Sequence, residues 1–74
     1  MRHLEVSFEN GLKLDFATNM NEQDFYAAIE NWKLREPVHV EAKDKEQAEI
    51  SFWRYIKSKQ TDDMAVPLDL WNAL

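Results

Sequence analysis

Apolar and polar side chains alternate along residues 3–16, with a break at Asn10-Gly11. Alternation with a period of two is typical of strands that bury one face, and an Asn-Gly step marks a tight turn. The pattern therefore predicts a β-hairpin with one apolar face. The apolar positions are Leu4, Val6, Phe8, Leu12, Leu14 and Phe16.

The register of this hairpin depends on its loop. A two-residue turn at Asn10-Gly11 would place apolar side chains opposite polar ones, although partners across a ladder share a face. A three-residue loop over residues 9–11, with Gly11 in the left-handed region, pairs Phe8 with Leu12 and keeps one face apolar. We therefore predict the three-residue loop.

On the polar face, this register places Glu5 opposite Asp15. Two like charges in this position lower stability unless a cation neutralises them. His3 and Lys13 are the candidate cations. Without such a partner, the two carboxylates would form an acidic patch.

A helical period follows the hairpin. Asn21 is suited to be the N-cap, and acidic residues occupy the next turn, where they stabilise the helix dipole. The helix must end before Pro37, because a residue that precedes proline is driven toward extended geometry. The apolar stripe at helical spacing consists of Phe25, Ala28, Ile29 and Trp32.

Residues 38–42 alternate again and predict a third strand. After a charged turn over 44–47, residues 48–59 fit two structures. As a helix, they would follow Asp44 as N-cap, with Gln47 completing a capping box. As strands, they would pair with residues 38–42 through a short loop, and their content of Ile, Phe, Trp and Tyr favours this choice. We adopt the strand interpretation.

The sequence thus predicts an α+β fold, in which a small antiparallel β-sheet of two hairpins packs on one α-helix. A β-β-α-β-β domain would span residues 1–60. Residues 61–74 would form an acidic and apolar C-terminal tail with a short helical turn, packed on the domain or on a partner. Pro67 suits the first position of that turn.

The chain has 74 residues and no cysteine, so one small core must hold the domain without disulfides. Because a core of this size is marginal, we expect a homodimer. Acidic residues number 14 and basic residues 9, which gives a net charge of −5. This balance disfavours binding to phosphate backbones and suits a basic protein partner. The absence of a long apolar run and of a signal-peptide pattern predicts a cytoplasmic protein with no membrane partner.

The sequence contains no recognisable catalytic, metal-binding or cofactor-binding motif. His3 and His39 are isolated on the polar faces of predicted strands, and Asp62-Asp63 is an acid pair with no base nearby. We therefore do not expect an enzyme, a bound metal or cofactor, or a small-molecule substrate.

One run is both basic and aromatic, Trp53-Arg54-Tyr55 followed by Lys57 and Lys59. Such side chains can stack single-stranded nucleic acid, which makes a small nucleic-acid-binding domain an alternative function. The net negative charge instead favours a packing role for the aromatic residues. We therefore expect no direct contact with nucleic acid.

The tail contains a further candidate segment, Pro67-Leu68-Asp69-Leu70-Trp71. It resembles the short peptide by which bacterial polymerases and repair factors hold the DNA sliding clamp, typically Gln-Leu-Ser/Asp-Leu-Phe. Three positions match, while Trp71 replaces the Phe and Pro67 replaces the Gln. In size and acidity, the whole chain is similar to the small phage-encoded inhibitors of the bacterial sliding clamp known from staphylococcal phages.

This resemblance implies a non-enzymatic inhibitor that keeps the sliding clamp from being loaded or from engaging DNA. In one mechanism, an acidic surface acts as a DNA mimic in the clamp's basic channel. The candidate residues for it are Glu5, Asp15, Glu22, Glu30, Asp62 and Asp63.

In the other mechanism, the tail fills the hydrophobic cleft of the clamp with Leu68, Asp69, Leu70 and Trp71. We favour the channel at this stage, because the charge belongs to the whole chain and the peptide motif lacks its Gln. The tail is then expected to cover the domain core or a dimer seam. A phage regulatory module with an unrelated protein partner is the remaining alternative.

Overall fold

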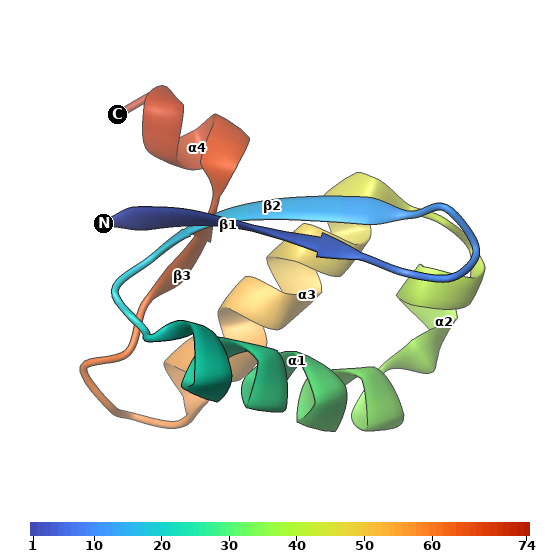
Figure 1. Cartoon of the computed structure of the whole chain (residues 1–74), viewed down its shortest axis with the longest axis horizontal. Coiled ribbons are helices and arrows are strands. Elements are labelled where there is room, and N and C mark those ends of the chain that lie inside the picture. The colour runs from blue at the N-terminus through green and yellow to red at the C-terminus, as the bar shows by residue number, and fades with distance from the viewer.

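The computed structural model describes residues 1–74 as an α+β fold, built from a three-stranded antiparallel sheet and four helices (Figure 1). The sheet has the order β1-β2-β3, so β2 is the central strand. In chain order the elements are β1 (Arg2–Ser7), β2 (Lys13–Thr18), α1 (Glu22–Arg35), α2 (Pro37–Glu41), α3 (Lys45–Ser58), β3 (Ala65–Pro67) and α4 (Leu68–Asn72).

The predicted N-terminal hairpin is confirmed, including its register. The backbone N–H of Phe8 donates to the carbonyl of Leu12 at 2.9 Å, which closes a three-residue loop. Gly11 has a φ of 93°, in the left-handed region that L side chains rarely adopt. Glu5 pairs with Asp15 across the ladder, as expected.

Helix α1 also matches its prediction. The side chain of Asn21 accepts a hydrogen bond from the backbone N–H of Asp24 at 2.8 Å, so Asn21 is the N-cap. The helix ends at Arg35, before Glu36 and Pro37. Its buried residues are the four predicted ones, Phe25, Ala28, Ile29 and Trp32.

The third strand predicted at residues 38–42 is wrong, because this segment is the short helix α2. Pro37 occupies its first position, where a missing N–H is tolerated. Val40 is buried, but the side chain of Val38 is 57% exposed. The alternation of the two valines therefore does not mark one buried face of a strand.

The second hairpin is wrong as well, since residues 45–58 form the continuous helix α3. The helical alternative for this segment is confirmed, with the side chain of Asp44 accepting from the N–H of Gln47 at 3.2 Å. Ala48, Phe52 and Ile56 are buried at a spacing of four residues. Residues 1–60 thus contain two strands and three helices, and not a β-β-α-β-β arrangement.

Residues 61–74 include a strand that the sequence did not reveal. In β3, Val66 pairs with Ala17 of β2, and Pro67 pairs with Phe16. The tail therefore completes the sheet. The predicted helical turn is present as α4, which begins at Leu68, one position after the proline.

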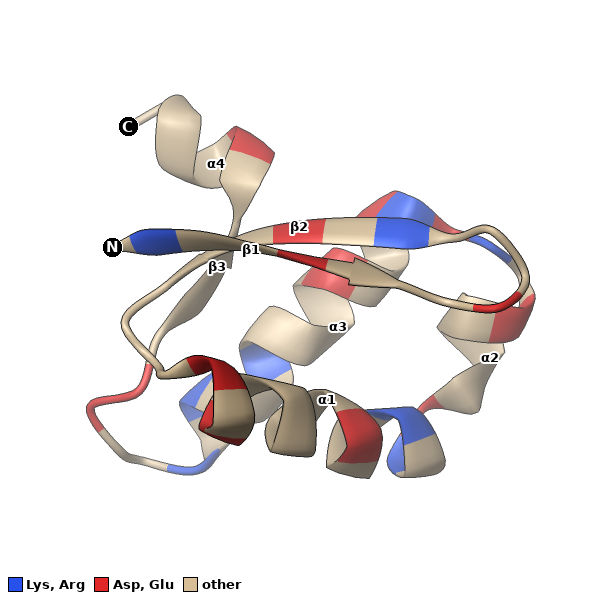
Figure 2. Cartoon of the chain, viewed as in Figure 1, with Lys and Arg blue, Asp and Glu red and all other residues tan.

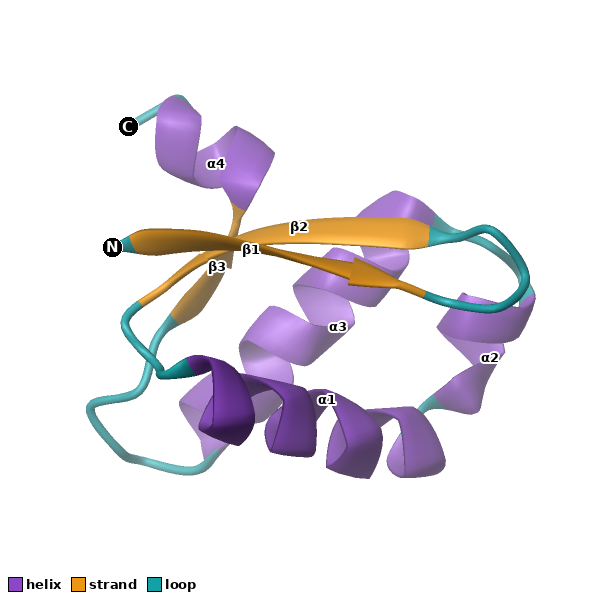
Figure 3. Cartoon of the chain, in the orientation of Figure 1, coloured by secondary structure: helices purple, strands orange, loops and turns teal.

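An aromatic cluster fills the space between the sheet and the two long helices. The ring centroid of Phe52 lies 5.1 Å from Phe16, 5.6 Å from Phe25 and 5.7 Å from Trp32. Helices α1 and α3 lie on this core face of the sheet, whereas α4 lies on the opposite, open face (Figure 3). None of the helices has the length and apolar character needed to cross a membrane.

Candidate functional site

The six predicted acidic residues do not form one surface. Glu5 and Asp15 lie on the open face of the sheet, since their neighbours in each strand face the core. The other four lie on α1 and on the loop before β3, on the helical side of the molecule (Figure 2). They are Glu22, Glu30, Asp62 and Asp63. A single docking face cannot use both groups.

The carboxylate of Asp15 contacts two basic side chains. Nε2 of His3 lies 3.3 Å from one carboxylate oxygen, and Nζ of Lys45 lies 3.3 Å from the other. Partial burial acts to raise the pKa of Asp15, but its contacts with His3 and Lys45 outweigh burial and lower that pKa overall. His3 contacts Asp15, as expected from the register. The cation that neutralises Asp15 is Lys45 of α3 and not the predicted Lys13.

Glu49 is a buried acid that the sequence did not single out, with only 5% of its surface exposed. Its carboxylate accepts a hydrogen bond from the backbone N–H of Asp15 at 2.8 Å. Burial raises the pKa of Glu49 above its ordinary value, against the opposing effect of that hydrogen bond. Its position on the buried side of helix α3 was the available signal, but the strand interpretation of this segment concealed it.

A group of exposed carboxylates gathers where α1 begins and the loop before β3 passes. We call it the acidic end, and it consists of Glu22, Asp24, Asp62 and Asp63. The side chain of Asn19 fixes the loop here, donating to the carbonyl of Asp62 and accepting from the N–H of Met64, each at 2.8 Å. The chain's only ion pairs are those of Asp15, so no cation neutralises the acidic end.

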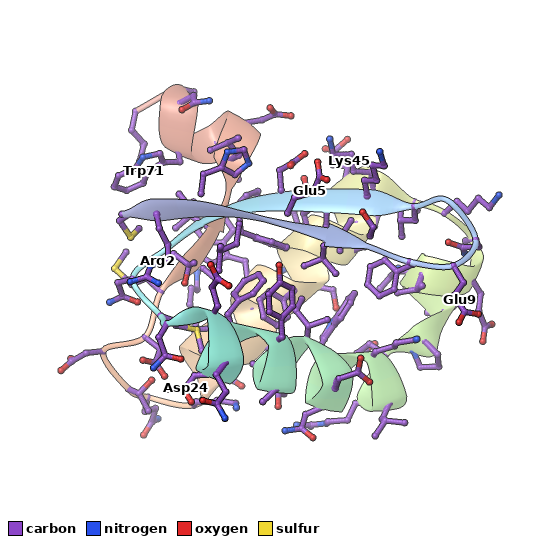
Figure 4. All side chains as sticks on the ribbon, in the orientation of Figure 1. Arg2, Glu5, Glu9, Asp24, Lys45 and Trp71 are labelled. Carbon is purple, nitrogen blue, oxygen red and sulfur yellow. The ribbon has the colours of Figure 1, made fainter.

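Helix α4 covers the open face near Ala17 and Val66, which are both buried there. No residue of the helix is fully buried. Its large apolar residues stay partly exposed, with Leu70 43% exposed and Trp71 37%, and Leu74, just beyond the helix, is 94% exposed. We call these three residues the C-terminal patch. Figure 4 shows Trp71 projecting from α4 beside the N-terminal end of β1.

The predicted tail segment therefore divides into two parts. Pro67 is buried in the sheet, and Leu68 is half-buried where the helix begins. Asp69, Leu70 and Trp71 are exposed. The tail packs on the domain through β3, whose three residues are buried, whereas the alternative of a dimer seam at the exposed side of α4 stays a prediction.

The basic and aromatic run lies on helix α3 and not on the predicted strands. Nζ of Lys57 lies 4.5 Å from the centroid of the Trp53 ring, and Nζ of Lys59 lies 4.7 Å from that of Tyr55. Cation–π contacts of this kind hold the aromatic rings against the surface of α3.

No cluster of three or more His, Asp or Glu side chains is arranged to hold a metal ion. Comparisons with protein-family models, with curated proteins and with solved structures gave no match. The function must therefore be argued from the surfaces of this chain, namely the C-terminal patch and the acidic end.

Proposed function

We propose that the protein is a non-enzymatic inhibitor that binds the bacterial DNA sliding clamp and holds it through the C-terminal patch. The supporting observation is that α4 is anchored by β3 yet has no fully buried residue and leaves Leu70 and Trp71 partly exposed. Large apolar groups held in place on a small domain are typical of a surface that docks on another protein. Leucine and tryptophan side chains of this kind fill pockets in a partner.

The clamp is the proposed partner because of the resemblance carried by residues 67–71. Asp69, Leu70 and Trp71 are exposed on α4, so they are accessible to a hydrophobic cleft. Filling the cleft would displace the polymerase peptide and stop replication. In this proposal the protein is encoded by a phage and acts in the cytoplasm of the bacterial host.

This choice reverses the preference drawn from the charge of the chain. Two of the six acidic candidates lie on a different face from the rest, and one of those two, Asp15, is neutralised by Lys45. A DNA mimic needs many unpaired negative charges on one face. The six acidic candidates therefore support binding in the clamp's basic channel less strongly than the C-terminal patch supports binding in its hydrophobic cleft.

A binding titration with purified bacterial sliding clamp tests the proposal. The double substitution Leu70→Ala with Trp71→Ala should abolish measurable binding, because anchors of this kind contribute about 2 kcal/mol or more each. The domain should stay folded, since neither side chain is part of the core. Binding by the wild-type protein should be tolerant of salt, as expected for an apolar contact.

The matched control is Leu34→Ala with Val38→Ala, which removes two exposed apolar side chains from other helices. This variant should bind like the wild-type protein. If the wild-type protein does not bind the clamp, the proposed partner is wrong. If the patch variant binds as tightly as the control, the proposed surface is wrong.

A DNA-mimic mechanism remains the second candidate, supported by the lack of ion-pair partners at the acidic end and at Glu30, further along α1. It predicts that Glu22→Lys with Glu30→Lys abolishes clamp binding and that binding weakens steeply with salt. The control is Glu9→Lys with Glu41→Lys, which makes the same change in net charge elsewhere. Equal binding by the two charge variants would eliminate this mechanism.

A further inference from the structure

A polar groove lies between the end of α1, the short helix α2 and one side of α3. It has a volume of about 340 Å³, within the range of small-molecule sites. Four of its lining residues recur at intervals of four, three and four along α3, and so share one face of that helix. They are Gln47, Ser51, Arg54 and Ser58.

The side chains that line the groove are more basic than acidic, although the protein as a whole has a net negative charge. Arg35 at the end of α1 and Arg54 of α3 both line it, together with His39 of α2. Glu36 is the one acid among the lining residues.

Neither arginine is used by the fold as an ion-pair partner. The only ion pairs in the chain are those of Asp15, and no guanidinium group donates a hydrogen bond to another part of the chain. Each guanidinium carries five N–H donors in a fixed fork, which matches the oxygens of an anion. Two such groups from different helices therefore share a concave surface with their donors unused.

Tyr55 holds one of these cations in position. The guanidinium carbon of Arg35 lies 5.5 Å from the centroid of the Tyr55 ring, so the arginine rests on the ring and not in open solvent. A side chain held in this way loses less conformational freedom when a ligand binds. The groove thus presents a partly preorganised cation beside a second one, Arg54, that is exposed.

We propose that this groove binds the phosphate group of a ligand, with Arg35 and Arg54 as the residues that contact its oxygens. Phosphate is favoured over a carboxylate because its two negative charges match two guanidinium forks. A volume of about 340 Å³ accommodates a ligand of mononucleotide size. This proposal does not depend on the sliding clamp.

A purely structural role for Arg35 predicts a different result in binding experiments. Cations in the last turn of a helix stabilise the helix dipole, and Arg35 stands in the last turn of α1. In that case, removing Arg35 would lower the melting temperature, and no phosphate compound would bind. Binding and stability must therefore be measured on the same variants.

The test is a titration of the ¹⁵N-labelled protein, followed by NMR, with adenosine monophosphate, inorganic phosphate and a single-stranded oligothymidylate in turn. We expect shifts at the groove residues with adenosine monophosphate. Arg35→Gln and Arg54→Gln should each raise the Kd by about tenfold or more, as expected for losing a charged hydrogen bond. Lys13→Gln, which removes an exposed cation outside the groove, should leave the Kd unchanged.

Arg54→Lys keeps the charge but loses the fork, and it should give an intermediate Kd with an unchanged melting temperature. Tighter binding of the oligonucleotide than of adenosine monophosphate would identify a nucleic-acid strand as the source of the phosphate, and the reverse order a small ligand. The proposal is overturned if none of the three probes shifts the groove residues. It is also overturned if neither glutamine variant weakens binding.

Discussion

The side chain of Glu49 lies beside the part of β2 that has no pairing with β3. β3 pairs only with Phe16, Ala17 and Thr18 of β2. The backbone N–H of Asp15 points to the same side of β2 as β3, but β3 does not extend far enough to pair with it. The carboxylate of Glu49 accepts this N–H and replaces the missing backbone carbonyl. A buried acid is tolerated here because the alternative is an unpaired buried donor, which is also costly.

Replacing Glu49 with alanine should therefore lower the free energy of unfolding by about 1–3 kcal/mol, the cost of leaving the N–H of Asp15 unpaired. Glu49→Gln keeps an oxygen acceptor at the same place and should cost much less. Urea unfolding followed by circular dichroism measures both. Glu46→Ala, at an exposed position of the same helix, is the control and should change little. Equal losses for the alanine and glutamine variants would contradict this role.

The pH dependence of stability gives an independent test. The pKa of Glu49 is raised by burial, so the folded protein binds more protons than the unfolded chain, and this contribution to stability falls as pH rises through the raised pKa. Asp15 has a lowered pKa and acts in the opposite direction, losing stability as pH falls. The substitution Glu49→Gln removes the pH-dependent contribution of Glu49 and leaves that of Asp15.

The stability of Glu49→Gln relative to the wild-type protein should therefore increase with pH from the acid range toward neutrality, and then level off. Urea midpoints of both proteins, measured at a series of pH values, provide the comparison. A difference that stays constant over the series would show that burial does not raise the pKa of Glu49.

At the scale of the elements, the sequence predicted those whose signals are local. The hairpin register follows from Gly11 and from the need to keep one face apolar. Helix α1 is bounded by Asn21 and Pro37, which act through their own backbone chemistry. Each of these predictions depends on residues close together in the chain, so long-range packing was not needed to make them.

The errors concern segments whose structure is decided by distant contacts. Ile, Phe, Trp and Tyr favour strands only where a pleated surface exists for them to pack on, and residues 45–58 instead pack on the sheet as a helix through Phe52. The three residues of β3 are too few to show a period, and one of them is Pro67. Only pairing with β2 makes this segment a strand.

The candidate sites, too, could be predicted only where their residues lie close together in the sequence. The exposed side of α4 was foreseen as a possible peptide because its residues are adjacent in the sequence. The polar groove was not foreseen, because Arg35 and Arg54 come together only when α1 and α3 pack.

Helix α2 also depends on a distant residue. A helix of five residues is too short to be stable alone. The side-chain amide of Asn10, in the hairpin loop, donates to the carbonyl of Val40 at 2.8 Å. Its oxygen accepts from the N–H of Leu12 at 3.1 Å, so one side chain joins the loop to the helix.

Asn10→Ala should lower the free energy of unfolding by about 1–3 kcal/mol and should accelerate hydrogen exchange in α2. Asn10→Asp keeps the acceptor for the N–H of Leu12 but loses the donor to the carbonyl of Val40. It should therefore accelerate hydrogen exchange in α2 while leaving the hairpin loop intact. Hydrogen exchange followed by NMR separates these effects. Asn72→Ala, which breaks no side-chain hydrogen bond, is the control. Unchanged exchange in α2 for Asn10→Ala would contradict this coupling.

At the scale of the whole molecule, charge and apolar surface are distributed unevenly. The acidic end, the polar groove and the C-terminal patch have no residue in common and contain no residue of the core cluster. Substitutions in one of these surfaces should therefore act independently of the others, because distant sites without shared partners are additive. This separation allows the clamp and phosphate proposals to be tested on one protein without interference.

The expected homodimer would use the C-terminal patch. The outer edge of β1 is obstructed, because the hydroxyl of Tyr26 donates to the carbonyl of Glu5 at 2.9 Å. A net charge of −5 on each copy opposes association, so we expect a weak dimer that salt strengthens by screening.

Sedimentation equilibrium at increasing salt should show this association for the wild-type protein. Trp71→Glu should remain monomeric, whereas Leu34→Glu, which adds the same charge at another exposed apolar position, should still associate. Clamp and dimer would compete for the patch, so adding clamp should dissociate the dimer. A wild-type monomer at every salt concentration, or a dimer that survives Trp71→Glu, would remove the patch as the seam.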